Sequence, residues 1–156
     1  MDQISDKVYL GNLYSAKDEE ELIKNNIRRV LSCNCYCDIE YKDKSIQHKI
    51  LELNDSPNTN IIKYFKEAIK FIDESDKVLV HCLGGISRSA TIVIAYFMWK
   101  DKLTYMESFN KLLEKRSVGP NYGFVQQLEI FQEKLKEANY DLDKIDFQNI
   151  EWPIQE

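Results

Sequence analysis

The sequence predicts an α/β fold with a central, mostly parallel sheet of about five strands flanked by helices. Two observations predict this class. Short apolar segments that suit strands alternate with longer segments in which apolar residues recur at helical spacing. In addition, residues 77–81 form a continuous apolar and β-branched run, which is typical of a strand covered on both faces. The length of 156 residues suits one domain with a sizeable core.

The first half of the chain contains three segments that suit strands, because each is short, rich in apolar residues and bounded by turn formers or polar residues. They lie at 8–11, 29–34 and 50–53. Between the first two, a short helix is expected to begin near Ser15 and to end at residues 25–26. The turn formers at 54–58 place a loop at the surface directly after the third strand.

Helical patterns dominate the second half. An amphipathic helix is expected over 61–75, and residues 90–99 are apolar all round, as in a helix buried in the middle of a domain. Thr104 and Glu107 form a capping box that begins the next helix. The last helix begins after residues 119–121, which end one helix and cap the other. Its expected inner face consists of Phe124, Leu128, Phe131 and Leu135.

Helical periodicity fades near the C-terminus. We therefore expect one folded domain at 1–138 and a C-terminal tail at 139–156. The tail carries two large aromatic residues, Phe147 and Trp152, through which it is expected to pack on the domain.

The composition argues against several classes of function. A formal charge of −5 provides no basic surface for nucleic acid or anionic lipid. The N-terminus has no basic segment followed by an apolar stretch, as a secretory signal would. The longest apolar run, 90–99, is about half the length that a membrane-spanning helix needs. We therefore expect a monomer located in the cytoplasm, and also in the nucleus, without nucleic-acid or membrane partners.

The four cysteines indicate neither a disulfide framework nor a zinc site. Cys33, Cys35 and Cys37 are two residues apart, and thiols so spaced on one strand do not easily pair with each other. This spacing also lacks the longer spacer of common zinc sites, and both histidines, His48 and His81, are distant in sequence. We expect no metal and no cofactor.

The segment at 82–88 carries the chemistry. It joins an expected buried strand to an expected buried helix, and its two glycines permit turns that point successive N–H groups at one centre. The N-terminus of the following helix adds further N–H groups and a positive dipole end, so the loop fits a tetrahedral oxyanion. A thiol at Cys82 should ionise readily there, because helix N-termini and nearby cations lower a cysteine pKa from about 8.5 to roughly 3.5–7.5. Arg88 has a planar fork that binds two phosphate oxygens at once.

Residues 81–89 also resemble the His-Cys-x-x-Gly-x-x-Arg-Ser signature of the cysteine-dependent protein phosphatases. The neutral loop at 83–87 and the apolar helix after it are similar to the dual-specificity branch of that family. The resemblance runs from Val8 to Leu135, and it includes the segments at 9–11 and 120–124.

The resemblance implies a role for each residue of the signature. Cys82 attacks phosphorus, and Arg88 binds the phosphate. Ser89 donates a hydrogen bond that helps the thiolate to leave, and His81 orients and tunes the cysteine. The expected phosphate cradle consists of Leu83, Gly84, Gly85, Ile86, Ser87 and Arg88.

Expulsion of a seryl, threonyl or tyrosyl oxygen needs a proton, so the chemistry demands an acid on a loop that faces the cradle. Asp55 is the candidate. It stands in the turn-rich loop after Leu53, and residues 53–56 are similar to the acid loop of the dual-specificity enzymes. Asp38 and Asp43 are the alternatives.

Other features have simpler interpretations. His48 is expected to be structural or solvent-facing, because nothing near it in sequence resembles a base with an orienting partner. The charged runs at 18–21 and 111–116 are expected to be solvated helix faces.

The clustered cysteines are most simply small residues at a strand end. The resemblance implies a further role for Cys33 or Cys35, as the partner in a reversible disulfide that protects the oxidised nucleophile.

The sequence thus predicts a phosphatase for phosphotyrosine and phosphoserine or phosphothreonine in proteins, kinases among them, acting through a phosphocysteine. The chain is shorter than the tyrosine-specific relatives, which favours a shallow pocket. An enzyme for lipid, RNA or glucan phosphates is the first alternative. The uncharged loop at 83–87 counts against lipid and RNA, although neutral loops also occur in glucan enzymes. The second alternative is a phosphate-binding module without turnover. Such a module would lack the cysteine, the arginine or the acid, and candidates for all three are present.

Overall fold

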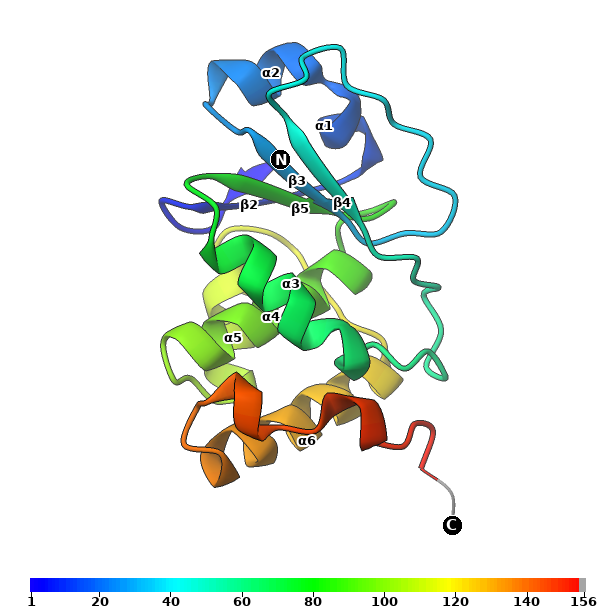
Figure 1. Cartoon of the computed structure of the whole chain (residues 1–156), viewed down its shortest axis with the longest axis vertical. Coiled ribbons are helices and arrows are strands. Elements are labelled where there is room, and N and C mark those ends of the chain that lie inside the picture. Colours follow the sequence, from blue (N-terminus) through cyan, green and yellow to red (C-terminus); the bar gives the residue numbers. More distant parts are fainter. Residues whose placement is uncertain (155–156) are drawn as a thin grey trace.

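The computed structural model describes residues 1–154 and confirms the α/β class (Figure 1). Within these residues, five strands form one sheet: β1 (Asp2–Gln3), β2 (Val8–Gly11), β3 (Arg29–Ser32), β4 (Gln47–Ile50) and β5 (Val78–His81). The α-helices are α1 (Leu13–Lys17), α2 (Glu19–Lys24), α3 (Phe65–Asp73), α4 (Arg88–Lys100), α5 (Tyr105–Leu113) and α6 (Tyr122–Glu137). The 3-10 helices are η1 (Ile62–Tyr64), η2 (Leu142–Lys144) and η3 (Phe147–Asn149).

The strands are arranged in the order β1-β2-β5-β3-β4. β1 runs antiparallel to β2, and the other neighbouring pairs are parallel. β5 therefore lies at the centre, as its continuous apolar run predicts, and all four of its residues are buried. Because parallel strands end at the same edge, the segments that follow β2, β3 and β5 meet at one side of the sheet.

The sheet separates two apolar layers (Figure 1). The larger core packs one face against α3 to α6, and α4 lies at its middle with residues 89–98 buried. The smaller core packs the other face against α1 and α2. The capping box of Thr104 and Glu107 begins α5, as predicted. Among residues 1–154, no helix is both long enough and apolar enough to cross a bilayer.

The fourth strand is displaced from its predicted position. It covers Gln47–Ile50, whereas the alternation at 50–53 predicts a strand three residues later. Leu51 and Leu53 are buried as the alternation requires, but only Leu51 continues the pairing, through its N–H to the Ser32 carbonyl (2.8 Å). The alternating apolar pattern at 50–53 therefore indicates which side chains are buried, and not which residues pair in the sheet. The single helix predicted near Ser15 is divided in two at Asp18, whose side chain caps α2.

The C-terminal segment packs along α6 (Figure 1, orange to red). Phe147 is 4% exposed, and its ring lies 5.9 Å from that of Phe131 on α6. Trp152 reaches further along the same surface, and its indole N–H donates to the carbonyl of Pro57 (2.7 Å). The segment after α6 thus connects the helical layer to the loop that contains Asp55.

Candidate active site

The loop at 82–87 leaves the carboxyl end of the central strand β5 and enters α4 at Arg88. Gly85 has a positive φ of 68°, and a Cβ there would collide with the carbonyl oxygen of Gly11 at the end of β2. Only glycine therefore permits both the turn and the close approach of the two strand ends. The loop carbonyls are turned outward by this fold, since those of Gly84 and Gly85 accept hydrogen bonds from Arg116 (both 3.0 Å).

Cys82 lies at the floor of this loop and is 2% exposed. Its Sγ accepts a hydrogen bond from the N–H of Gly85 (3.2 Å) and lies 3.1 Å from the hydroxyl of Ser89. Burial alone would raise the pKa of the thiol, but the hydrogen bonds of Ser89 and Gly85 and the charge of Arg88 outweigh it, so the pKa lies below its ordinary value. The surroundings favour the thiolate, as the sequence predicts.

Arg88 stands in the first turn of α4 and links this loop to the loop after β4. Its Nη1 donates to the carbonyl of Leu53 (2.9 Å). The guanidinium is thereby held against the start of the loop that carries Asp55. The cation is close enough to act on the thiol pKa of both Cys82 and Cys33.

Asp55 is exposed and is brought to the loop by two side chains. Its Oδ1 accepts hydrogen bonds from the hydroxyl of Ser87 (2.8 Å) and the amide of Asn121 (2.9 Å). The backbone N–H of Asn121 in turn donates to the Ser87 hydroxyl (3.0 Å), which closes a small network. Within residues 1–154, no hydrogen bond joins Asp38 or Asp43 to the loop, and Asp43 instead accepts from Ser45.

His81 directly precedes Cys82 at the end of β5 and is fully buried. Its Nδ1 lies 3.1 Å from the carbonyl oxygen of Cys82, and its Nε2 lies 2.5 Å from the hydroxyl of Ser32. The pKa of His81 is lowered to about 4, chiefly by burial. The bond to the Cys82 carbonyl opposes this shift, and His48 adds to it. The imidazole is therefore neutral near pH 7. Since a carbonyl oxygen only accepts, Nδ1 carries the ring proton.

Two residues of the site have no counterpart among the predicted site residues. Arg116 forms an ion pair with Asp2 (2.9 Å), and its side chain is only 16% exposed. The expectation that the run at 111–116 is only a solvated helix face is wrong for Arg116, because the chain after α5 folds back against the loop. Asn121 caps α6. It belongs to the segment at 120–124, whose resemblance to the family could have indicated a role in the site.

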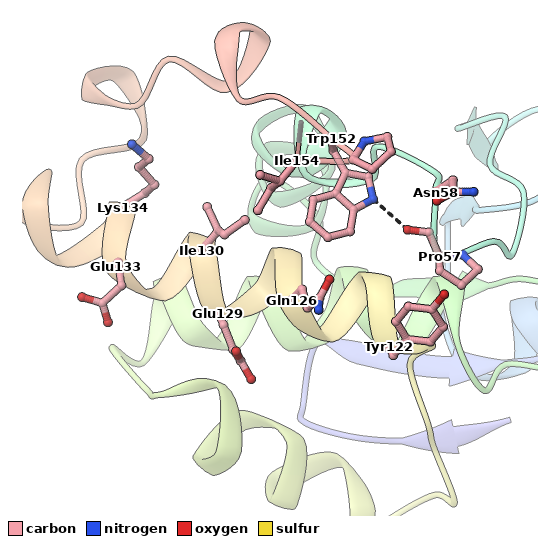
Figure 2. A pocket seen from close by; sticks show the side chains of 11 residues that line it. Pro57, Asn58, Tyr122, Gln126, Glu129, Ile130, Glu133, Lys134, Trp152 and Ile154 are labelled. Carbon is pink, nitrogen blue, oxygen red and sulfur yellow. Dashed lines mark hydrogen bonds between the residues drawn. The ribbon is translucent and has the colours of Figure 1, made fainter. Parts of the chain in front are cut away.

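The mouth of the site is apolar. Leu83, Ile86 and Tyr122 are 62%, 53% and 71% exposed around the loop and the start of α6. Beside the acid loop, a groove with a cavity volume of about 700 Å³ lies between α6 and the C-terminal segment (Figure 2). Pro57 and Trp152 both line this groove and are joined by the hydrogen bond drawn there.

A thiol that accepts an N–H of its own loop, an arginine in the first turn of the next helix and a carboxylate hydrogen-bonded to that loop define the class of cysteine-dependent phosphatases. The chain matches the dual specificity phosphatase catalytic domain over residues 8–134, and it belongs to that family. It is 36% identical over 137 residues to the human dual specificity protein phosphatase 22, a match that covers 85% of this chain and 73% of the relative.

Two further comparisons agree. The chain is 37% identical over 137 residues to a probable rhodanese domain-containing dual specificity protein phosphatase of Dictyostelium discoideum, a match that covers 85% of this chain. It spans only 29% of that relative's length. The crystal structure of DUSP15 superposes with a TM-score of 0.79 at 33% identity, over 88% of this chain and 90% of the other.

Proposed function

We propose that the chain hydrolyses phosphotyrosine and phosphoserine or phosphothreonine in proteins through a phosphocysteine intermediate. The observation that supports this most is the lowered pKa of the Cys82 thiol, in a loop that also holds Asp55 through Ser87 and that continues into Arg88. Residues 1–138 would form the catalytic domain, with 139–156 as a packed tail. We include phosphorylated kinases among the substrates on the resemblance alone.

In the first step, the Cys82 thiolate attacks phosphorus, a sulfur–phosphorus bond forms and the bond to the substrate oxygen breaks. The N–H groups of 83–88 and the Arg88 guanidinium bind the three equatorial oxygens, where negative charge is held in the transition state. Asp55 gives its proton to the leaving oxygen. Because Oδ1 already accepts two hydrogen bonds, Oδ2 is the oxygen suited to carry that proton.

In the second step, water attacks the phosphocysteine and the sulfur–phosphorus bond breaks. Asp55, now ionised, takes a proton from the water, and inorganic phosphate leaves. The electron pair returns to Sγ, where the Ser89 hydroxyl and the Gly85 N–H stabilise the thiolate. Neutral His81 holds the Cys82 carbonyl and so orients the start of the loop.

The rim of the site supports a protein substrate. The loop side chains at 83–87 are uncharged, and the exposed side chains of Leu83, Ile86 and Tyr122 offer apolar contacts to residues that flank a phosphorylated side chain. A lipid headgroup or an RNA strand carries further phosphates, which a loop without lysine or arginine at 83–87 leaves unpaired.

The test compares leaving groups in variants of the acid and the nucleophile. Cys82→Ser should abolish turnover of every substrate. Asp55→Asn should slow hydrolysis of phosphothreonine and phosphotyrosine peptides by on the order of 100-fold or more, yet affect an activated aryl phosphate much less, because a good leaving group departs almost without a proton. Steady-state kinetics on both substrate types measures the contrast.

Asp38→Asn and Asp43→Asn are the matched controls and should leave both rates unchanged. Equal losses on good and poor leaving groups in Asp55→Asn would show a structural defect instead of lost acid catalysis. Retained turnover in Cys82→Ser would overturn the mechanism. A protein that binds phosphopeptides without hydrolysing them would be the binding module considered above.

A further inference from the structure

A second group of reactive side chains lies on the opposite side of the sheet from the nucleophile. Ser32 on β3 is paired in register with His81 on β5, and His48 on β4 is paired with Val30. Because side chains two apart on a strand share a face, His48, Ser32 and His81 all point to the layer of α1 and α2. Cys37 comes from the connection between β3 and β4.

These side chains converge on one point. The ligand atoms of Cys37, His48 and His81 all lie within 4.8 Å of one another. The hydroxyl of Ser32 lies between the two rings, 2.7 Å from His48 Nε2 and 2.5 Å from His81 Nε2. Cys37 Sγ lies 3.8 Å from His48 Nε2. His81 is buried, whereas Cys37 and His48 are half-buried, so the cluster can be reached from solvent.

The hydrogen bonds leave donor atoms suited to a cation. His81 carries its proton on Nδ1, facing the Cys82 carbonyl, so its Nε2 lone pair points into the cluster. Ser32 donates its one proton to that lone pair, and the Nε2–H of His48 then donates to Ser32. Two imidazoles and a thiol are a donor set that binds zinc, a cation of intermediate softness.

We propose that Cys37, His48 and His81 form a binding site for Zn²⁺. On binding, the thiol of Cys37 loses its proton to solvent, and His48 carries its ring proton on Nδ1 in place of Nε2. Nε2 of both histidines and Sγ of Cys37 become ligands, with water or the Ser32 hydroxyl in the fourth position. Zinc bonds of about 2.0–2.3 Å place tetrahedral ligand atoms about 3.4–3.6 Å apart, so small side-chain rotations suffice.

The site revises the expectation that no metal binds. That expectation rested on sequence spacing, whereas the parallel register of β3, β4 and β5 brings distant residues together. Cys33 and Cys35 are not positioned to bind an ion in this cluster. Cys35 Sγ donates to the side chain of Asn54 (3.0 Å), and Cys33 is buried in the larger core with Cys82.

The test measures zinc binding in a Cys82→Ser background, so that the catalytic thiolate cannot bind the ion. Titration of zinc against a chromogenic chelator should show one equivalent bound. Cys37→Ser and His48→Gln should each weaken the affinity by at least about tenfold, and Cys35→Ser, the matched control, should leave it unchanged. Cobalt loaded in place of zinc should show a thiolate-to-metal absorption band that is lost only in Cys37→Ser.

Three results would overturn the site. These are the absence of stoichiometric zinc on the folded protein, equal affinity with and without Cys37, and an equal loss in Cys35→Ser. Circular dichroism of each metal-free variant checks that it is folded. If His48→Gln unfolds, the cobalt spectra of Cys37→Ser and Cys35→Ser decide alone. Because the readout is metal binding, the result is independent of whether the chain is a phosphatase.

Discussion

The pKa of Cys82 results from a balance between opposing effects on one side chain. Burial to 2% exposure disfavours a thiolate, whereas the N–H of Gly85, the hydroxyl of Ser89 and the charge of Arg88 favour it. Each of these partners is fixed by the turn from β5 into α4. The pKa of Cys82 is therefore lowered by local geometry, in a segment of eight residues from 82 to 89.

Removing one of these partners should be visible as a change in reactivity with pH. Ser89→Ala should raise the pKa of Cys82, because the thiolate loses a hydrogen bond while its burial remains. At about pH 6, alkylation of Cys82 by iodoacetamide should become several-fold slower, since only the thiolate reacts. Mass spectrometry of the Cys82 peptide across a pH series measures the midpoint.

Ser87→Ala is the control for this prediction, because the Ser87 hydroxyl donates to Asp55 and makes no hydrogen bond to the thiol. Its midpoint should match that of the unchanged protein. An unchanged midpoint in Ser89→Ala would show that the backbone N–H groups and Arg88 alone set the ionisation of Cys82.

At the scale of elements, the loop at 82–87 is held by segments far apart in the chain. The carbonyl of Gly11 at the end of β2 lies against Gly85, Arg116 after α5 holds two loop carbonyls, and Asn121 before α6 holds Asp55. Arg116 also forms an ion pair with Asp2, so β1 is linked to this loop through the segment after α5. These contacts all lie within the protein, so they hold the loop without help from a substrate.

Arg116→Ala should therefore weaken the binding of phosphate-like inhibitors. The loss of its charge-assisted hydrogen bonds, each about 1.5–3 kcal/mol, releases the carbonyls of Gly84 and Gly85 and should cost at least about tenfold in the inhibition constant of vanadate. Lys115→Ala, at a neighbouring exposed position, should change nothing. Equal vanadate inhibition in both variants would contradict a supporting role for Arg116.

The sequence was most informative where structure is local. Three features depend only on residues close together in sequence: the turn from Cys82 to Ser89, the central strand and the capping box at Thr104. Each is found as predicted. Arg116 and His48 could not be predicted in the same way. Their partners, at Gly85 and Ser32, are distant in sequence, and only strand register and the return of the chain bring them together.

For the whole molecule, the two apolar layers on either side of the sheet enclose a titratable group. His81 is fully buried, and burial first of all lowers its pKa to about 4 from the ordinary 6.5. In the unfolded chain the ring binds a proton near its ordinary pKa, whereas in the folded protein it does not until the pH is much lower. Between these values, acid stabilises the unfolded chain relative to the folded one.

The free energy of unfolding should therefore be unaffected by this group above pH 6.5 and should fall as the pH is lowered toward about 4. Over that window the loss should approach about 3 kcal/mol. Urea unfolding at a series of pH values measures it. His81→Asn should reduce the pH dependence, and an equal slope in the variant would assign the acid sensitivity to other groups.

The segment beyond α6 bears on how large the cooperative folding unit is. Leu142, Ile145 and Phe147 belong to the same apolar core as α4 and α6, and Trp152 reaches the loop of Asp55. The region shared with the family ends at residue 134, well before these contacts. A polypeptide cut at that boundary would expose the outer surface of α6 to water and leave the acid loop without its brace. We therefore expect the segment that folds cooperatively to extend beyond the region that the family has in common.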